Sequence, residues 1–326
     1  MDKVTGTMDS DILITIKDLA RYFVLGKKRI LKAVDGVDFS IRRGETFGVV
    51  GESGCGKSTL GRTLIGLYQP TRGSIMFDGI SVHERKNTHA AELSRRMQMI
   101  FQDPYTSLNP RMKVNDIIAE GIDNHHMAKN LQERNRMVAE LLFSVGLDED
   151  HAGRYPHEFS GGQRQRIGIA RALSLNPDFV IADEPISALD VSIQAQIVNL
   201  LKSLQKKRHL TYMFIAHDLS MVRYISDRIC VMYLGKIVEL TDTSELFSSP
   251  LHPYTMALLS SVPIPDPIEE SNRTRIELPG SVQSPINPGE GCRFFKRCTR
   301  ASEICEHETP LLKEPVPGHL VACHRI

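Results

Sequence analysis

A glycine-rich segment early in the chain has the composition of a phosphate-binding loop. Residues 51–58 read Gly-Glu-Ser-Gly-Cys-Gly-Lys-Ser. Glycines let consecutive backbone N–H groups point at one anion, and a helix that starts after the loop adds its positive end. The spacing predicts that Lys57 reaches the β- and γ-phosphates of ATP and that Ser58 binds Mg²⁺. A glycine-rich turn without a ligand is the alternative. The residues expected to contact the nucleotide are Gly51, Glu52, Ser53, Gly54, Cys55, Gly56, Lys57, Ser58 and Thr59.

Two adjacent carboxylates follow a second apolar stretch. Asp183 and Glu184 come directly after residues 179–182, Phe-Val-Ile-Ala. Successive side chains of a strand point to opposite faces, so the two acids can have different roles. We expect Asp183 to bind Mg²⁺ and Glu184 to act as the general base that activates the attacking water. Two solvated acids at a strand end are the alternative when this pair is taken alone.

The elements around these residues predict an α/β fold with a parallel sheet. An apolar strand, 46–50, precedes the loop and a helix, 59–67, follows it. Strand patterns and helix patterns then alternate, which is typical of a largely parallel sheet. The expected strands are 12–16, 31–41, 74–82, 179–182, 212–216 and 228–232, and the expected helices include 192–206 and 219–226. Between about 105 and 175 the pattern is mostly helical, notably at 132–145 and 162–173.

Composition narrows the class of protein. The chain has 326 residues with a net charge of +1, and 24% of them are charged. Without a basic stretch, nothing indicates nucleic acid as a partner. No apolar run reaches the roughly 18–20 residues that span a bilayer, and the N-terminus has no apolar segment of a secretion signal. We therefore expect a cytosolic protein whose membrane association comes through partners.

A third segment carries a family resemblance. Residues 159–163 read Phe-Ser-Gly-Gly-Gln, just before an expected helix. This resembles the Leu-Ser-Gly-Gly-Gln signature of the ATPase subunits of ABC transporters, with Phe in place of Leu. The resemblance implies a P-loop ABC ATPase fold with a helical subdomain, and a second anion site that grips the γ-phosphate held by the other ATPase of a dimer. The signature residues are Ser160, Gly161, Gly162 and Gln163.

Other family elements occur in the expected order. Gln102 resembles the Q-loop glutamine that contacts Mg²⁺ or water, and residues 187–190, which end at Asp190, resemble the D-loop that crosses the dimer interface. His217 resembles the switch histidine at the γ-phosphate. Phe23, or its neighbour Tyr22, is the candidate for the aromatic ring that stacks on adenine. The resemblance thus places Glu184, His217, Gln102 and Lys57 in the catalytic site.

The resemblance narrows to the oligopeptide/dipeptide importer branch at residues 101–111, 183–196 and 250–255, and the details are more similar to the second, F-type ATPase. It implies a second ATPase subunit, identical to this chain or different from it, two transmembrane permease subunits and an extracytoplasmic peptide-binding protein. The expected location is peripheral, at the cytoplasmic face of the cell membrane. Nickel chelates are an alternative cargo, and a soluble ABC ATPase outside transport is the rival class.

The last part of the chain differs from the rest in amino-acid composition. Prolines crowd the segment after about residue 260, and four cysteines follow it. We expect an ABC ATPase domain at 1–260, with its helical subdomain at about 103–178, and a Pro-rich arm with a small C-terminal extension at 261–326. Four thiols in a reducing cytosol favour a metal site over disulfides. The branch resemblance implies a [4Fe–4S] cluster, with Zn²⁺ or unliganded thiols as alternatives, at Cys292, Cys298, Cys305 and Cys323.

Overall fold

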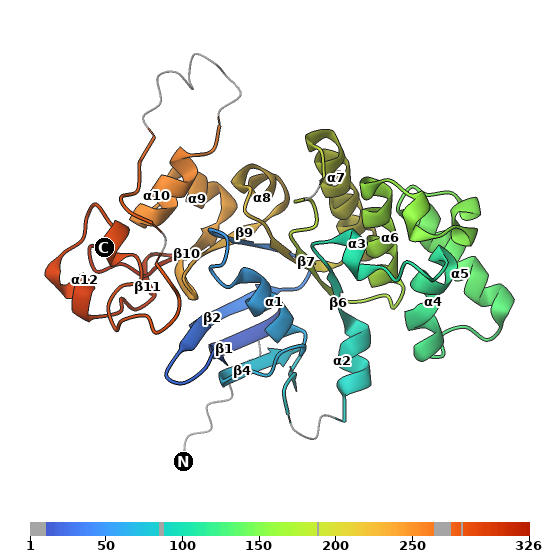
Figure 1. The fold of residues 1–326 in the computed structure, drawn as a ribbon, viewed down its shortest axis with the longest axis horizontal. Helices are drawn as coiled ribbons and strands as arrows, with labels where there is room; N and C mark the ends of the chain where they lie inside the picture. Colours follow the sequence, from blue (N-terminus) through green and yellow to red (C-terminus); the bar gives the residue numbers. More distant parts are fainter. Residues whose placement is uncertain (1–10, 85–87, 188, 264–274, 282) are drawn as a thin grey trace.

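The computed structural model describes residues 11–84, 88–187, 189–263, 275–281 and 283–326. Two sheets and a group of helices make up the molecule (Figure 1). The central sheet has eight strands in the order β11-β12-β10-β9-β3-β8-β7-β6, and a second sheet has four in the order β2-β1-β4-β5. Part of the expected Pro-rich arm, residues 264–274, and Ala188 of the expected D-loop lie outside the described residues.

Five neighbouring strands of the central sheet run parallel, as the sequence predicts, and the others are antiparallel. The parallel strands are mostly apolar because both of their faces are largely buried. Phe47 and Val49 of β3 face the core shared with the four-stranded sheet, while Val50 faces the core shared with the helices. The bounds are β3 Thr46–Val50, β6 Met97–Ile100, β7 Phe179–Asp183, β8 Thr211–Ile215, β9 Arg228–Tyr233, β10 Lys236–Asp242, β11 Lys313–Val316 and β12 His319–Val321.

The four-stranded sheet is antiparallel. Its strands are β1 Ile12–Val24, β2 Ile30–Arg42, β4 Arg72–Phe77 and β5 Ile80–Ser81. The strand expected at 12–16 therefore continues to Val24. The helix expected at 59–67 is α1, Lys57–Leu64, and it ends early because Gly66 takes a φ of +81° that stops the helix.

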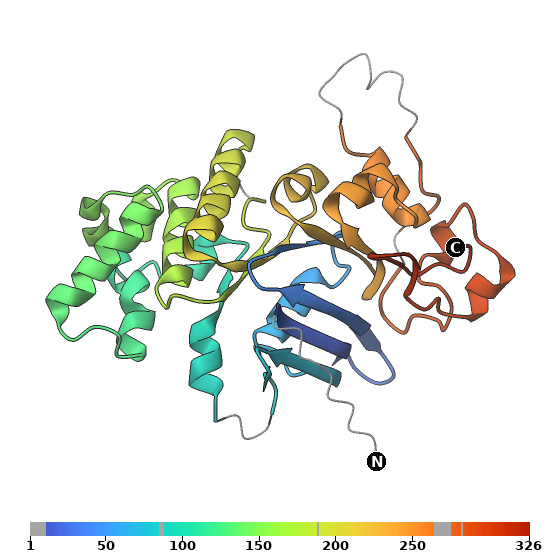
Figure 2. The ribbon, with the colours of Figure 1, turned by 180° about the vertical axis from the view of Figure 1, so that it is seen from behind.

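The expected helical region is present and lies at one end of the molecule (Figures 1 and 2). It contains α3 Pro104–Ser107, α4 Val114–Asn124, α5 Leu131–Ser144, the short 3₁₀ turns Glu149–Gly153 and Pro156–Glu158, and α6 Gly161–Leu173. α4 and α6 bury apolar faces against each other, including Ile118 and Ile169. This packing gives the helices a core continuous with that beneath the central sheet.

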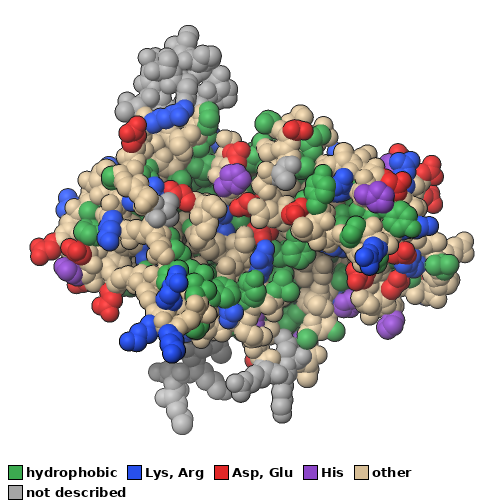
Figure 3. Space-filling model, in the orientation of Figure 1, with side chains coloured by type: hydrophobic (Ala, Val, Ile, Leu, Met, Phe, Trp, Pro, Cys, Tyr) green, Lys and Arg blue, Asp and Glu red, His purple; other side chains and the backbone are tan. Residues whose placement is uncertain are grey.

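The remaining described helices lie outside the helical region. They are α2 Ala90–Arg96, α7 Val191–Arg208, α8 Leu219–Ile225, α9 Thr243–Ser248, α10 Pro253–Ser260, the 3₁₀ turn Phe295–Arg297 and α12 Glu303–His307. In the described part of the chain, no helix has the length and apolar character needed to cross a membrane. On the face shown in Figure 3, the described basic and acidic side chains are interspersed.

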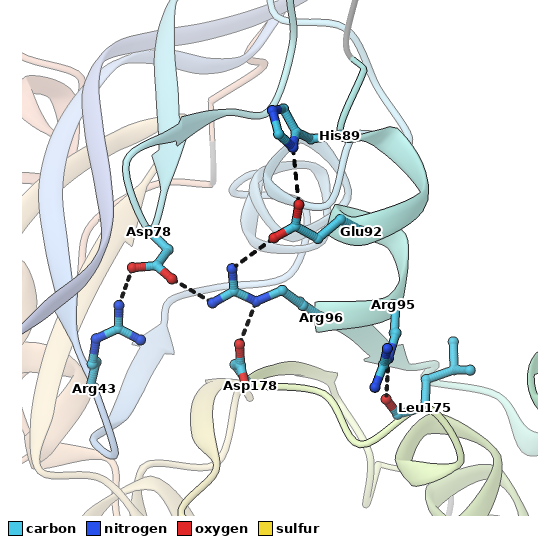
Figure 4. Close-up of polar contacts among 8 residues, drawn as sticks. All are labelled: Arg43, Asp78, His89, Glu92, Arg95, Arg96, Leu175 and Asp178. Carbon is cyan, nitrogen blue, oxygen red and sulfur yellow. Dashed lines mark hydrogen bonds and ion pairs between the residues drawn. The ribbon is translucent and has the colours of Figure 1, made fainter. Parts of the chain in front are cut away.

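Arg96 at the end of α2 connects three parts of the fold (Figure 4). Its guanidinium donates to Asp178 at 2.6 Å, before β7, and to Asp78 at 2.5 Å, in the turn after β4. It also pairs with Glu92 of its own helix. The neighbouring Arg95 donates to the carbonyl of Leu175, after α6. These contacts attach α2 to both sheets and to the helical region.

The C-terminal extension joins the central sheet at the end opposite the helical region (Figure 1). β12 pairs with β10 through Glu239–Val321 and Leu240–Leu320, and β11 pairs with β12. The sequence patterns had indicated neither β10 nor this pairing. His319 and Glu239 are both buried, and the 2.7 Å contact between His319 Nε2 and Glu239 Oε1 joins β12 to β10. The extension is thus continuous with the central sheet through hydrogen bonds.

Candidate functional site

The predicted phosphate loop connects β3 to α1. In the described structure, Lys57 Nζ donates to the carbonyls of Gly51 at 2.8 Å and Glu52 at 3.1 Å. Gly56 precedes the helix with a φ of +108°, and a Cβ there would lie 1.9 Å from the carbonyl oxygen of Ala33. Only glycine accommodates that backbone and that contact. The local sequence thus fixes a tight loop that leads into the N-terminal end of a helix.

Ser58 and Asp183 meet at the base of this loop. Ser58 Oγ donates to Asp183 Oδ1 at 2.7 Å, and Arg62 Nη2 lies 3.8 Å from Asp183 Oδ2. Burial raises the pKa of the Asp183 carboxyl, while the Ser58 hydrogen bond and the charge of Arg62 oppose the rise. Asp183 Oδ2 is buried without a hydrogen-bond partner in the described structure. A hydroxyl beside a carboxylate with a free buried oxygen is a donor set that fits Mg²⁺.

Glu184 directly follows β7 and has an uncommon backbone conformation. Its φ is +46°, a strained value for a residue with a side chain, of the kind that gathers at functional sites. Gln102 Nε2 donates to Glu184 Oε2 at 2.9 Å. His217 Nδ1 is 3.7 Å from the same oxygen, and the imidazole is 60% exposed. The structure therefore brings together Glu184, Gln102 and His217, three of the residues expected in the catalytic site.

A cavity of about 240 Å³ opens over these groups. The predicted residues that line it are Ser53, Gly54, Gly56, Lys57, Ser58, Thr59, Gln102 and Glu184. Leu31 and Ala33 of β2 also line it, and the sequence patterns gave no sign of them. Cys55, within the loop, is buried, and burial raises the pKa of its thiol. The cavity is thus lined by the phosphate loop, by the polar side chains of Gln102 and Glu184, and by an apolar wall from β2.

The register of β1 and β2 separates the two candidates for the adenine contact. Phe23 is paired with Leu31, which lines the cavity, and paired residues of antiparallel strands point to the same face. The Phe23 ring packs edge-on against Tyr68, with the Arg21 guanidinium 4.5 Å from its centre. The Tyr22 hydroxyl is instead hydrogen-bonded to Asp35. This geometry favours Phe23 over Tyr22.

The signature residues lie elsewhere. Ser160 caps α6, where its hydroxyl accepts from the Gln163 N–H while the Gln163 side chain accepts from the Ser160 N–H. Gly161 and Gly162 form the first turn of that helix, and Asp190 is exposed at the start of α7. None of these residues lines the cavity over Lys57. One chain therefore does not bring its own signature to its own phosphate loop.

The second residue of the phosphate loop is held by the C-terminal part of the chain. The Glu52 N–H donates to the Tyr254 hydroxyl at 2.9 Å, from α10. Arg297 Nη1 donates to both carboxylate oxygens of Glu52, at 3.0 and 2.9 Å. Arg297 and Glu52 are 245 residues apart in the chain. Because both partners are distant in sequence, motif reading found neither Tyr254 nor Arg297.

The four C-terminal cysteines lie in one region but do not form an assembled metal site. Among the described residues, no three His, Cys, Asp or Glu side chains are placed to hold one metal ion. The pKa of Cys292 is raised to about 11, mainly by burial and to a smaller extent by the nearby Cys305, Cys298 and Cys323. Backbone N–H groups of Arg300 and Arg325 donate to the sulfurs of Cys298 and Cys323. The expected cluster is therefore not confirmed, although the thiols are near enough to interact electrostatically.

A larger groove of about 400 Å³ lies between the sheets and the helical region. It is lined by the segment after α1, by α2 and β6, and by α4 and α6. Its lining includes Leu67, Ser94, Phe101, His125 and Arg171. Arg171 is anchored in the wall by a 2.6 Å hydrogen bond to the carbonyl of Ser107. Phe101 directly precedes Gln102, so the groove adjoins the segment that contacts Glu184.

Comparison with known proteins agrees with this geometry. Residues 34–187 match the family model described as ABC transporter, and residues 238–305 match the oligopeptide/dipeptide transporter C-terminal region. The chain is 60% identical to the putative oligopeptide transport ATP-binding protein YkfD of Bacillus subtilis, over 96% of this chain and 95% of that protein. It is 57% identical to the oligopeptide transport ATP-binding protein OppF of Bacillus subtilis, over 95% and 96% respectively.

Among solved structures, the ATP-binding cassette MJ0796, described as dimeric and bound to ADP and phosphate, superimposes with a TM-score of 0.65 at 28% identity. The match covers 71% of this chain and 99% of that one. The fold is thus the P-loop ABC ATPase fold with mixed α/β sheets, as predicted. The chain belongs to the ATP-binding, ATP-hydrolysing subunits of ABC transporters, within the group that carries the oligopeptide/dipeptide transporter C-terminal region.

Proposed function

We propose that the chain is the motor subunit of an importer that carries oligopeptides or dipeptides across the cytoplasmic membrane, working peripherally at the cytoplasmic face. The observation that carries the proposal is the cavity over Lys57, where Ser58–Asp183 and Gln102–Glu184 converge, in a chain that also has the oligopeptide/dipeptide C-terminal region. The first feature supplies ATP hydrolysis, and the second supports the class of cargo.

The roles of the residues follow from their positions. Mg²⁺ would be held by Ser58, Asp183 and Gln102, and it would neutralise charge on the phosphates. Lys57 binds phosphate oxygens through its ammonium group. Glu184 takes the proton of the attacking water, while His217, beside it, contacts the γ-phosphate. Phe23 stacks on adenine from the apolar wall that Leu31 begins.

The active assembly requires a second ATPase chain, identical or different. The signature residues Ser160 to Gln163 cap a helix outside this chain's own cavity, so they complete the site of the partner. The dimeric structure of the MJ0796 cassette is consistent with this arrangement. The isolated chain should hydrolyse ATP slowly because half of each site is missing.

The groove beside Gln102 is the proposed contact for a transmembrane permease subunit. A partner seated there contacts β6 and α4 together, one residue away from Gln102. Ser94→Trp should fill the groove and uncouple hydrolysis from transport, while nucleotide binding stays intact. Ala91→Trp, one turn earlier on α2 and outside the lining, is the matched control. Equal transport in both variants would contradict this docking site.

The C-terminal cysteines are proposed to hold a [4Fe–4S] cluster, with Zn²⁺ as the alternative. The fit rests on four free thiols that interact electrostatically and on two sulfurs that accept backbone N–H groups, as cluster ligands do. Iron, sulfide and zinc analysis of anaerobically purified protein tests this. Cys298→Ser should lose the metal and Cys230→Ala, within β9, should retain it. Wild-type protein without iron or zinc would refute a metal site.

The decisive experiment measures ATP hydrolysis of the chain assembled with its permease subunits and binding protein, with and without a panel of peptides. Peptide-stimulated hydrolysis that vanishes in Glu184→Gln would support both the motor and the cargo. Stimulation by a nickel chelate or another solute instead would keep the motor and refute the peptide assignment. Failure to assemble with any permease would favour the rival, a soluble ABC ATPase.

A further inference from the structure

Arg297 and Glu52 form an ion pair between the cysteine-bearing extension and the phosphate loop. Both contacts from Arg297 Nη1 are at about hydrogen-bond length, 3.0 and 2.9 Å. The Arg297 side chain is 9% exposed and the Glu52 side chain 24%. Pairs that are shielded from solvent are screened less by water and salt than exposed pairs. The charge of Arg297 therefore offsets the charge of Glu52 more strongly than it would in a pair exposed to solvent.

Glu52 places a carboxylate at an unfavourable position for a phosphate site. Its neighbour Ser53 lines the cavity, and the Glu52 carbonyl accepts from Lys57 Nζ. ATP brings several negative charges into that cavity, so an unpaired carboxylate in the same loop would repel it. Among the described residues, the cation in an ion pair with Glu52 is Arg297. The extension thus supplies the charge that balances the loop.

We propose that Arg297 is a positioning residue of the nucleotide site, which neutralises Glu52 and thereby sets the affinity of the phosphate loop for ATP. The inference rests on nucleotide binding at residues 51–58 and is independent of the cargo. Arg297 directly precedes Cys298, so the extension and the nucleotide site share this contact. Tyr254 adds a second support, because its hydroxyl holds the backbone N–H of the same glutamate.

A purely structural tether and charge neutralisation make opposite predictions for Glu52→Gln. Either single substitution breaks the ion pair, so a tether would be weakened equally by Arg297→Gln and Glu52→Gln. Under charge neutralisation, Arg297→Gln leaves a free carboxylate and weakens binding, whereas Glu52→Gln removes the repulsive charge. The double variant, Arg297→Gln with Glu52→Gln, should then regain the affinity that Arg297→Gln loses.

The experiment is an equilibrium titration of the full-length chain with a fluorescent ATP analogue and Mg²⁺. We expect Arg297→Gln to raise the Kd about three- to tenfold, with the increase shrinking at high salt. Glu52→Gln should bind as tightly as wild type or more tightly, and the double variant should lie within about twofold of wild type. Arg297→Lys, which keeps the charge, should recover most of the affinity.

Lys296→Gln is the matched control, because it removes an exposed cation one residue away that is not paired with Glu52. It should leave the Kd unchanged. In the assembled transporter, Arg297→Gln should raise KM for ATP while kcat stays within about twofold. A double variant as weak as Arg297→Gln, or a Glu52→Gln variant with weakened binding, would overturn the proposal. The second outcome remains decisive if Arg297→Gln fails to fold.

Discussion

The side-chain amide of Gln102 donates to the carboxylate of Glu184 at 2.9 Å, and this hydrogen bond joins the ends of two neighbouring strands, β6 and β7. It orients one carboxylate oxygen while His217 approaches the same atom. Phe101, which lines the groove between the sheets and the helical region, directly precedes Gln102, so the side chain of Gln102 lies between that groove and the Glu184 carboxylate.

Glu184→Gln should lower ATP hydrolysis by about 10²–10⁴-fold, the usual contribution of a general base, and should leave ATP binding nearly unchanged. The amide cannot take a proton from water but keeps the shape of the side chain. Phosphate release by the assembled complex and nucleotide titration of the chain measure the two effects. Glu140→Gln, on an exposed part of α5, is the control. Full hydrolysis by Glu184→Gln would mean that another group is the base.

Gly161→Asp should abolish hydrolysis by the assembled dimer and leave ATP binding by the isolated chain intact. A Cβ at Gly161 meets only an ordinary contact, 3.4 Å from Leu189, so the fold tolerates the change. The new carboxylate would repel the γ-phosphate of the partner's nucleotide. Gly162 is unsuitable for this test because a Cβ there would lie 2.6 Å from Ile193.

Gly153→Asp, where a Cβ has open space, controls for the added charge on the helical region. We expect it to hydrolyse ATP at the wild-type rate. Loss of nucleotide binding in isolated Gly161→Asp would show that the signature acts within its own chain, contrary to the proposed dimer.

Asp183→Asn should stabilise the nucleotide-free and Mg²⁺-free protein at neutral pH. Burial raises the pKa of the Asp183 carboxyl, so the folded chain binds a proton there more readily than the unfolded chain. Stability therefore falls as the pH rises through the ordinary carboxyl value, about 4, to the raised one. The amide avoids this cost. We expect a thermal midpoint about 1–4 °C higher at pH 7, with the difference shrinking toward pH 4.

The same variant should lose Mg²⁺-dependent ATP hydrolysis, because an amide is a poorer Mg²⁺ ligand than a carboxylate. Thermal unfolding with and without Mg²⁺ and ATP separates the two effects. A lower midpoint for Asp183→Asn at pH 7 would contradict the sign of the raised pKa.

His319→Gln should destabilise the protein by about 1–3 kcal/mol, because it disturbs a buried hydrogen bond to Glu239. Glu239 also accepts from the N–H groups of Leu251 and His252, so the loss reaches the segment before α10. His307→Gln, on the exposed side of α12, should change the midpoint little. Equal thermal unfolding of the two variants would show that the buried pair contributes no stability.

The sequence predicted the features that depend on residues adjacent to one another in the chain. The strand before the phosphate loop, the helix after it and the two carboxylates at the C-terminal end of β7 and directly after it are local patterns, and the structure has each of them. Leu31 was inside a predicted strand, but its place on the cavity depends on how β1 and β2 pair. Local periodicity carries no information about that pairing.

The contacts of the C-terminal extension lay beyond sequence reasoning for the same reason. Arg297 reads as an ordinary basic residue beside a cysteine, and its partner is 245 positions away. The strand β10 begins at Lys236, after a tight turn of two residues at the end of β9 that includes Gly235. The sequence pattern therefore did not indicate it as a separate strand. Ligand geometry at the four cysteines also depends on tertiary packing, so their spacing alone could not fix it.

The pairing of β12 with β10 has a consequence for how the molecule behaves at high concentration. An uncovered outer strand offers free N–H and C=O groups to other chains and invites aggregation. Here β10 is covered, and the outermost strand, β11, carries Lys313, Glu314 and Pro315. Charges resist burial against another chain, and proline has no N–H to donate. At this edge, the extension therefore ends the central sheet with a strand that is poorly suited to further pairing. This disfavours aggregation of the protein through strand pairing at that edge.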